Sequence, residues 1–275
     1  MRSRGTRGLW GVVALLLLAG LMALAATAPE FLSTPDLDRI ALGPGDAPPF
    51  GTDDRGISLL EYAAQGASIV VAPALFSGFV VMMLSTMAGL VRCAGLTWID
   101  GAIQVASELV GSLPRLVVIL VVALILPSDY RTLLPIGLTW ALLAAPGAMD
   151  EAAATAGRLG GERFVEALKA HGFSGVRIYL YHVVWLNLRS VIVRQGAEVT
   201  MHVVFLEIAL SYLALRRNEP SFTHADSEFS WATLLYQGYT ALLGSDLMHA
   251  LWLGLGLVAA TAVMAQAVRL SARAR

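Results

Sequence analysis

Residues 164–185, FVEALKAHGFSGVRIYLYHVVW, form a basic, helix-prone segment between two strongly apolar runs of the chain. A charged helical segment of this kind is expected to project from a membrane, because charges are costly within hydrocarbon. The flanking runs approach the length of about 20 apolar residues that a membrane-spanning helix needs. The segment therefore predicts an all-α polytopic membrane protein with a short amphipathic helix outside the bilayer.

The composition of the whole chain agrees with this prediction. Of its 275 residues, 57% are hydrophobic and only 14% are charged, and the mean hydropathy is +0.69. Soluble domains usually carry about 25% charged residues. The net charge of −1 gives no indication of a nucleic-acid partner.

Single residues exclude two kinds of site. Cys93 is the only cysteine, so neither an intrachain disulfide nor a cysteine-cluster metal site can form. Lys169 is the only lysine, and it follows Leu168 rather than the glycine that the phosphate-binding motif GxxxxGKS/T requires. We therefore expect no cofactor in this chain, and any ATP to be bound elsewhere.

Six apolar segments are predicted to span the membrane. They are residues 9–27, 69–91, 102–126, 133–148, 190–213 and 246–268. The third carries Pro114-Arg115 near its centre, which predicts a kink. The fourth is short and is expected to end near Pro146-Gly147.

The distribution of arginine and lysine predicts the orientation, because cytoplasmic loops are enriched in both. Basic residues before the first span, after the last span and between spans four and five place both termini and the loop at about 150–185 in the cytoplasm. These residues are Arg2, Arg4, Arg7, Arg158, Arg163, Lys169, Arg177, Arg189, Arg269, Arg273 and Arg275. Residues 29–65 and 214–245 are then outside loops, and only Arg216-Arg217 oppose the rule.

The N-terminal 28 residues have two interpretations. Arginines, an apolar run and Ala26-Thr27-Ala28 are also features of a cleaved signal peptide. The apolar run is longer than the usual core of about 7–15 residues, which favours a retained first helix. Residues 1–28 would then form a tail and the first span, and residues 66–270 a single membrane domain. Trp231 and Tyr236, in the second outside loop, are expected at the membrane interface.

Seven landmarks along the chain carry a family resemblance. They are Gly51-Thr52-Asp53 with Gly56 and Gly66-Ala67, Trp98-Ile99-Asp100, Ser112-Leu113-Pro114, Pro146-Gly147, Arg177-Ile178 with His182, Glu207 to Leu213 (EIALSYL), and Trp231 with Leu234-Leu235. In their order and over about residues 9–260, they resemble the permease subunits of the oligopeptide, dipeptide and nickel ABC importers.

The resemblance implies a cytoplasmic coupling loop with an "EAA" motif and a glycine. Glu151-Ala152-Ala153 with Gly157 has the same spacing as Glu166-Ala167-Leu168 with Gly172. We choose the second, because Glu166 lies twenty residues after Pro146, as the corresponding residue does in the family. Ala167 and Gly172 would allow close approach of a partner, Glu166 would pair with a basic residue, and apolar residues would fill a groove of an ATPase. The apolar residues are Phe164, Val165, Leu168 and Phe173.

The resemblance also implies partners and a location. A type I ABC importer permease works with a sister permease subunit, two ATP-binding subunits or domains and an extracytoplasmic substrate-binding protein, in the bacterial inner membrane. Its cargo would be peptide-like, or a metal or metal chelate. The chain departs from the family at Ile57-Ser58, Trp185 and Ala214, and it lacks the family's C-terminal motif. Cargo and partner details are therefore expected to have diverged.

Charged residues within the predicted spans are candidates for a translocation path. Arg194, Glu198 and His202 are spaced four apart, on one face of the fifth span. Alternatively, Arg194 and Glu198 form a structural pair near the cytoplasmic end, and His202 bonds another helix. Glu108, in the third span, would meet Arg115 or a partner subunit. A structural role is favoured for Glu108.

Two other functions remain open at this stage. Arg194, Glu198 and His202 could serve a polytopic membrane enzyme, but the chain has no GxSxG or HExxH motif to accompany them. Glu108 and Glu198 could be proton sites of an ion-driven carrier, although no internal repeat is evident. His224, Asp226 and Glu228 form only a poor set of metal ligands.

Overall fold

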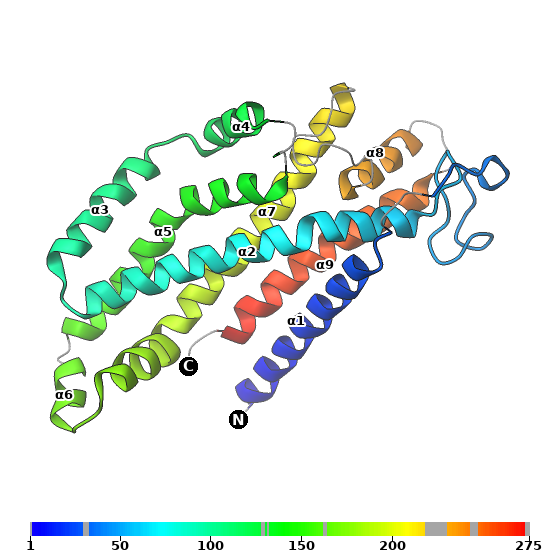
Figure 1. Cartoon of the computed structure of the whole chain (residues 1–275). Coiled ribbons are helices and arrows are strands. Elements are labelled where there is room, and N and C mark those ends of the chain that lie inside the picture. The colour runs from blue at the N-terminus through cyan, green and yellow to red at the C-terminus, as the bar shows by residue number, and fades with distance from the viewer. Residues whose placement is uncertain are drawn as a thin grey trace.

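The computed structural model describes residues 2–29, 33–127, 130, 132–161, 164–217, 230–242 and 247–272. The described residues form an all-helical protein without strands (Figure 1). Its α-helices are α1 (Arg2–Ala26), α2 (Leu59–Cys93), α3 (Thr97–Gly111), α4 (Arg115–Ile125), α5 (Leu133–Gly161), α6 (Phe164–Ala170), α7 (Arg189–Arg217), α8 (Trp231–Ala241) and α9 (Met248–Ala272). A 3₁₀-helix η1 (Leu37–Arg39) and a π-helix η3 (Arg177–Leu188) complete it.

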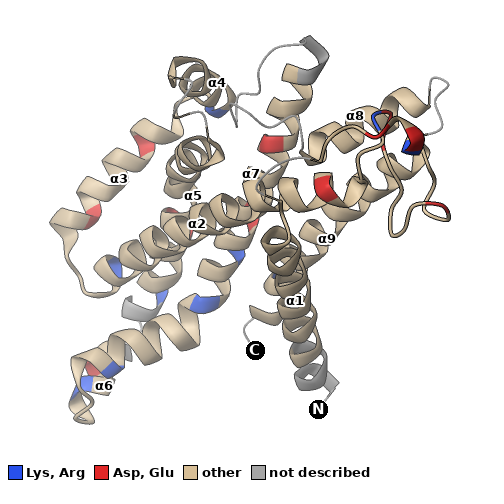
Figure 2. Ribbon diagram, turned by 45° about the vertical axis from the view of Figure 1, so that its right-hand side comes forward, with Lys and Arg blue, Asp and Glu red and all other residues tan. Residues whose placement is uncertain are grey.

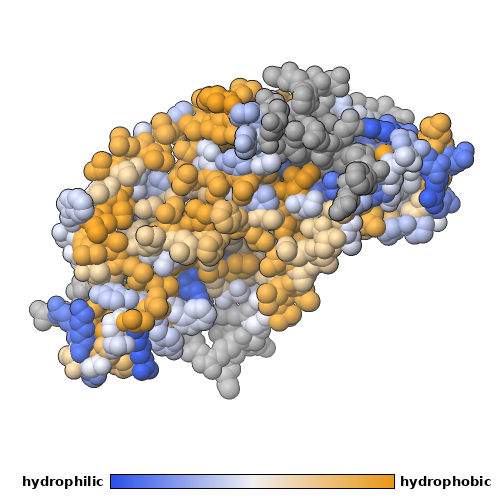
Figure 3. Space-filling model, in the orientation of Figure 1, coloured by the Kyte–Doolittle hydropathy of each residue, from blue (hydrophilic) through white to orange (hydrophobic). Residues whose placement is uncertain are grey.

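Several of these helices are long and apolar enough to cross a membrane. Five segments of the described chain qualify, and they become six if α3 and α4 together make one span. The five are Gly8–Ala26, Leu59–Cys93, Leu133–Arg158, Arg177–Ala214 and Met248–Ala272. Hydrophobic residues cover the middle of the face shown in Figure 3, whereas hydrophilic residues gather toward its ends. The predicted all-helical class is confirmed for the described residues, and several of these helices could span a membrane as predicted.

The predicted kink in the third span is a break between two helices. α3 ends at Gly111, α4 begins at Arg115, and the two axes differ by 79°. Pro114 precedes α4 in an extended conformation and has no N–H to offer to the preceding turn. Because the residue before a proline also avoids helical angles, the chain leaves the helix before it re-enters one.

The fourth span differs from its prediction. The helix does not end near Pro146-Gly147, since α5 continues through Pro146 to Gly161. Buried alanines at 141, 148 and 152 line α5, and Gly89 of α2 lies close to the carbonyl of Ala152. Close packing of α5 on α2 offsets the hydrogen bond that Pro146 removes from the helix interior.

Small residues let the central helices approach closely. At the crossing of α2 and α7, a Cβ added to Gly78 would lie 2.7 Å from the carbonyl oxygen of Gly196. Glycine pairs of this kind allow the backbones of membrane helices to touch. α1 packs on the same core through Leu17, Leu18 and Leu21.

The predicted outside loop 214–245 contains a helix, and its tryptophan is not at a membrane interface. Trp231 begins α8, is fully buried, and donates its indole N–H to the carbonyl of Ala63 at 3.0 Å. Gly66 leaves room for the indole ring, because a Cβ there would collide with it. Tyr236 lies in the same helix, with its ring 6.0 Å from that of Tyr212.

The two ends of the molecule differ in charge. The N-terminal end of α1 and the C-terminal end of α9 lie on the same side of the molecule as α6. Residues 33–58 lie with α8 at the opposite end (Figure 1). Lysine and arginine gather around α6 and the adjoining ends of α2 and α7, whereas the opposite loop carries several acidic residues (Figure 2). This polarity is what the positive-inside rule requires of a cytoplasmic α6 end.

Candidate functional site

α6 ends in a glycine cap that accounts for the spacing between Glu166 and Gly172. The N–H of Phe173 donates to the carbonyl of Leu168 at 3.2 Å, and that of Gly172 to Lys169 at 2.9 Å. Gly172 has a φ of +80°, which completes a Schellman motif. The glycine six residues after Glu166 is therefore explained by the cap that ends α6, because glycine adopts a positive φ without steric cost.

Three apolar residues of this segment pack, fully or in part, against the protein itself. Val165 is 8% exposed, and Leu168 and Phe173 are half-buried against an apolar cluster. That cluster consists of Cys93, Ala156, Val165, Ile178, Val183, Leu188 and Ile192. Val165 therefore packs within its own bundle, whereas Leu168 and Phe173 stay partly exposed, and their contact with a partner's groove stays a prediction. The side chain of Phe164 lies outside the described residues.

The opposite face of α6 is accessible. Glu166, Ala167 and Gly172 are exposed, together with the adjoining Lys169 and His171. A Cβ added to Gly172 would meet no atom within 4 Å, so space is open beside it. The polar face that a partner would need is therefore free on this chain, and a contact with an ATPase stays a prediction.

The helix after α6 is a π-helix, which sequence reasoning did not anticipate. η3 presents the large exposed apolar side chains Leu180, Tyr181, Trp185 and Leu186, and Val176, just before it, is exposed as well. Two arginines lie over aromatic rings there: Arg177 is 5.0 Å from the centre of Phe173, and Arg189 is 4.9 Å from that of Trp185. π-Helical segments are frequent at functional sites.

Arg194 pairs with a different partner from the one predicted. Its guanidinium donates to Glu151 on α5, and the side-chain amide of Gln195 donates to the other oxygen of the same carboxylate. The predicted bridge between Arg194 and Glu198 is therefore wrong. The cause is the length of α5, which continues past Pro146 and brings Glu151 opposite Arg194.

Glu198 and His202 face a polar pocket of about 340 Å³ between α7 and α9. Gln266 and Arg269 of α9 complete its polar lining, and Met201, Ala262 and Ala265 contribute the apolar part. The ring of His202 lies 5.3 Å from that of Trp140 on α5. The structure thus brings together the predicted path residues Glu198 and His202. It adds Gln266 and Arg269, which sequence reasoning missed. Arg269 was missed because it was grouped with the basic C-terminal tail.

Glu108 lies apart from these residues. It is exposed on α3, and the described residues contain no ion pair between it and Arg115. The 79° break separates the helix that carries Glu108 from the helix that carries Arg115, so the predicted meeting of the two is wrong. A contact with a partner subunit remains a prediction.

The landmark Gly51-Thr52-Asp53 with Gly56 forms a tight turn at the end of the molecule opposite α6. Asp53 is fully buried and accepts hydrogen bonds from the N–H of Ile57 at 2.7 Å, the N–H of Arg55 at 2.9 Å, and the hydroxyl of Tyr62. Gly51 and Gly56 have φ values of 90° and 79°. The turn therefore fastens the loop to the start of α2.

The described residues contain no group of three His, Cys, Asp or Glu side chains that could hold a metal ion. The poor candidate set His224, Asp226 and Glu228 lies outside the described residues. No protein-family model matches the chain, and a search of curated proteins finds no significant match. The functional interpretation therefore rests on the residues and their arrangement.

Proposed function

We propose that this chain is the membrane-spanning permease subunit of an ATP-driven ABC importer. It would form a path for peptide-like cargo, or for a metal or metal chelate, together with a sister permease subunit. Two ATP-binding subunits would supply ATP and Mg²⁺, and a substrate-binding protein would deliver cargo from outside. The chain itself would perform no chemistry.

The observation that supports this proposal most is the construction of the α6–η3 segment. Some of its apolar residues, among them Val165 and Ile178, are buried against α2, α5 and α7, while Glu166, Ala167 and Gly172 face outward. A pull on the exposed face would therefore be transmitted to the bundle instead of being lost in a flexible loop. This is the property that a coupling element between an ATPase and a membrane gate requires.

The polar pocket supports a translocation role. A charge at the centre of a membrane costs roughly 2.5–3.5 kcal/mol on insertion scales, so unneeded charges are rare there. Glu198, His202 and Arg269 nevertheless line one pocket between two membrane-length helices. We infer that this pocket borders the cargo path. The Arg194–Glu151 pair, one turn nearer the α6 end of α7, would hold α5 and α7 together beside it.

The proposed setting is the bacterial inner membrane, with both termini and α6 in the cytoplasm. The polarity of charge along the molecule favours this orientation (Figure 2). The turn around Asp53, residues 33–58 and α8 would then form the outside surface. A substrate-binding protein would dock there.

Gentle purification from the native membrane tests the proposal. Mass spectrometry should find an ATPase with a phosphate-binding motif, and Glu166→Lys should release it. Asp54→Lys reverses a charge of the same sign on the exposed loop at the opposite end and should leave the ATPase bound. An intact complex that contains no ATPase would overturn the assignment.

An ion-driven carrier is the second candidate, because Glu198 and His202 share one pocket. Such a carrier would move cargo without an ATPase, and its transport would respond to a proton gradient. The enzyme alternative lacks support, since the lining of this pocket includes no serine, threonine or cysteine nucleophile. Transport that is driven by ATP in a reassembled complex separates the importer from both.

A further inference from the structure

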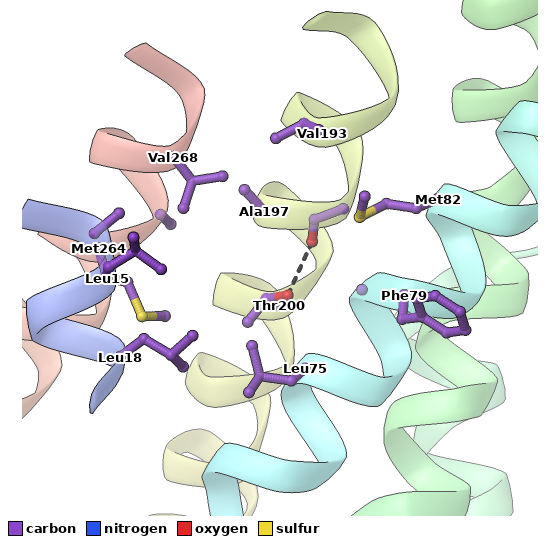
Figure 4. A pocket seen from close by; sticks show the side chains of 14 residues that line it. Leu15, Leu18, Leu75, Phe79, Met82, Val193, Ala197, Thr200, Met264 and Val268 are labelled. Atoms are coloured by element: carbon purple, nitrogen blue, oxygen red, sulfur yellow. Dashed lines mark hydrogen bonds between the residues drawn. The ribbon is translucent and has the colours of Figure 1, made fainter. Parts of the chain in front are cut away.

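A second pocket, of about 230 Å³, lies between α1, α2, α7 and α9 (Figure 4). Its walls are apolar, with Leu18, Leu75, Val193 and Met264 each contributed by a different helix. The hydroxyl of Thr200 also reaches it, but that hydroxyl donates to the carbonyl of Gly196 at 2.9 Å. Apolar cavities without unsatisfied polar groups stay free of water, so the expected occupant is a hydrocarbon group.

The pocket opens toward the surface that a membrane would surround. Leu15 and Phe79, which border it, are 67% and 55% exposed on helices long enough to cross a bilayer. Val193 lies four residues after the start of α7, about 6 Å along the helix. Val268 lies four residues before the end of α9. The pocket therefore lies toward the α6 end of both α7 and α9.

A cation lies on α7 one helical turn before the pocket, on the side nearest α6. Arg189 precedes Val193 by one helical turn, so the two residues share a face of α7. Its guanidinium lies 4.9 Å from the ring centre of Trp185, which is 56% exposed. Tryptophan favours the interface between hydrocarbon and headgroups, and arginine binds phosphate oxygens through paired N–H groups.

We propose that the pocket and Arg189 form a binding site for one anionic phospholipid. An acyl chain enters between α1, α2, α7 and α9, and the phosphate contacts Arg189 beside Trp185. Electrostatic complementarity selects a phospholipid over a neutral apolar molecule, because an apolar molecule gains nothing from the arginine. The site depends on the membrane location of the chain and not on the transport function.

Native mass spectrometry of the intact protein tests the site. The protein is released from nanodiscs that contain phosphatidylglycerol and phosphatidylcholine. We expect one tightly retained phosphatidylglycerol. Ala197→Leu fills the pocket and should lower retention of both lipids about tenfold, whereas Arg189→Gln should lower retention of phosphatidylglycerol alone by about the same factor. Val268→Phe fills the same space from α9 and provides a second variant if Ala197→Leu disturbs packing.

Matched controls lie on α7 and on the adjoining η3. Ala209→Leu adds the same atoms on an exposed part of α7, and Arg177→Gln removes an arginine that also lies over an aromatic ring. Both should retain lipid as the unmodified protein does. The proposal would be overturned if folded Ala197→Leu and Val268→Phe both retained phosphatidylglycerol as well as the unmodified protein does. It would also be overturned if Arg177→Gln and Arg189→Gln lost phosphatidylglycerol to the same extent, or if the retained molecule were not a phospholipid.

Discussion

Arg194 on α7 and Glu151 on α5 form an ion pair between residues that are 43 positions apart in the chain. Gln195 donates to the same carboxylate, so both oxygens of Glu151 have partners on α7. The pair joins α5 to α7, whose Glu198 and His202 line the polar pocket, and Trp140 of α5 lies with its ring 5.3 Å from that of His202. It is the kind of contact that fixes the register of two membrane helices.

A double-mutant cycle on this pair should give a measurable coupling energy. Both side chains are about one third exposed, at 34% and 37%, so we expect about 1 kcal/mol and not the larger value of a fully buried pair. Glu151→Gln and Arg194→Gln are compared singly and together by denaturant unfolding in detergent. The cycle of Glu151→Gln with Arg177→Gln is the control and should show no coupling. Additive effects in the first cycle would contradict the pairing.

The cap of α6 gives a second prediction. Gly172→Ala forces an alanine into a positive φ and should cost about 1 kcal/mol locally. Hydrogen exchange of the amides of residues 165–173 should then become about fivefold faster. Gly175→Ala is the matched control, because Gly175 is also exposed, has room for a Cβ, and does not have a positive φ. Equal protection in both variants would show that the cap does not stabilise α6.

Much of this fold could be predicted from the sequence, because long apolar runs have few alternatives to membrane-spanning helices. The break at Pro114 followed from the missing N–H of proline and from the restriction on the residue before it. The presence of Glu198 and His202 in one polar pocket also followed, since residues four apart share a helix face.

The wrong predictions concern features that depend on tertiary packing, such as where a helix ends and which side chains are buried. Whether a helix ends at Pro146 depends on the packing of its neighbours, and buried alanines on α5 allow it to continue along α2. That error concealed the pairing of Glu151 with Arg194. The same limit applies to Val165, because an amphipathic pattern shows that one face is apolar but not which body covers it. A tryptophan such as Trp231 similarly suits both an interface and a core.

The crossing of α2 and α7 should not tolerate even one added methyl group. In Gly196→Ala the new Cβ would lie 2.6 Å from the sulfur of Met82 and 3.1 Å from the carbonyl oxygen of Gly78. We expect a loss of about 1–3 kcal/mol and a lower melting temperature in detergent. Gly256→Ala on α9 is the control, because a Cβ there meets nothing within 4 Å. A loss of similar size in both variants would argue against the close crossing.

Trp231 should contribute far more to stability than an exposed tryptophan. Trp231→Phe removes the hydrogen bond to Ala63 and leaves a void in the core, at a cost of about 2 kcal/mol. Trp252→Phe makes the same chemical change at a residue that is 68% exposed and should cost little. Unfolding curves of the two variants in the same detergent make the comparison. If Trp231 were at the membrane surface, their stabilities would be alike.

The polar pocket should be open to water-soluble reagents even though α7 is long and apolar enough to cross a membrane. Glu198 lines that pocket, whereas Ala209, on the same helix, is exposed on the outer surface of the bundle. Each is replaced by cysteine in a Cys93→Ser background, which removes the only native thiol. In proteoliposomes, a charged maleimide should modify the thiol at position 198 and leave the thiol at position 209 unmodified, because the reagent does not enter hydrocarbon. Modification should reach both positions once detergent replaces the lipid, which verifies that each thiol is reactive. A thiol at position 198 that stays protected in lipid but reacts in detergent would show that this pocket is closed to water, and a path along Glu198 and His202 would then be untenable.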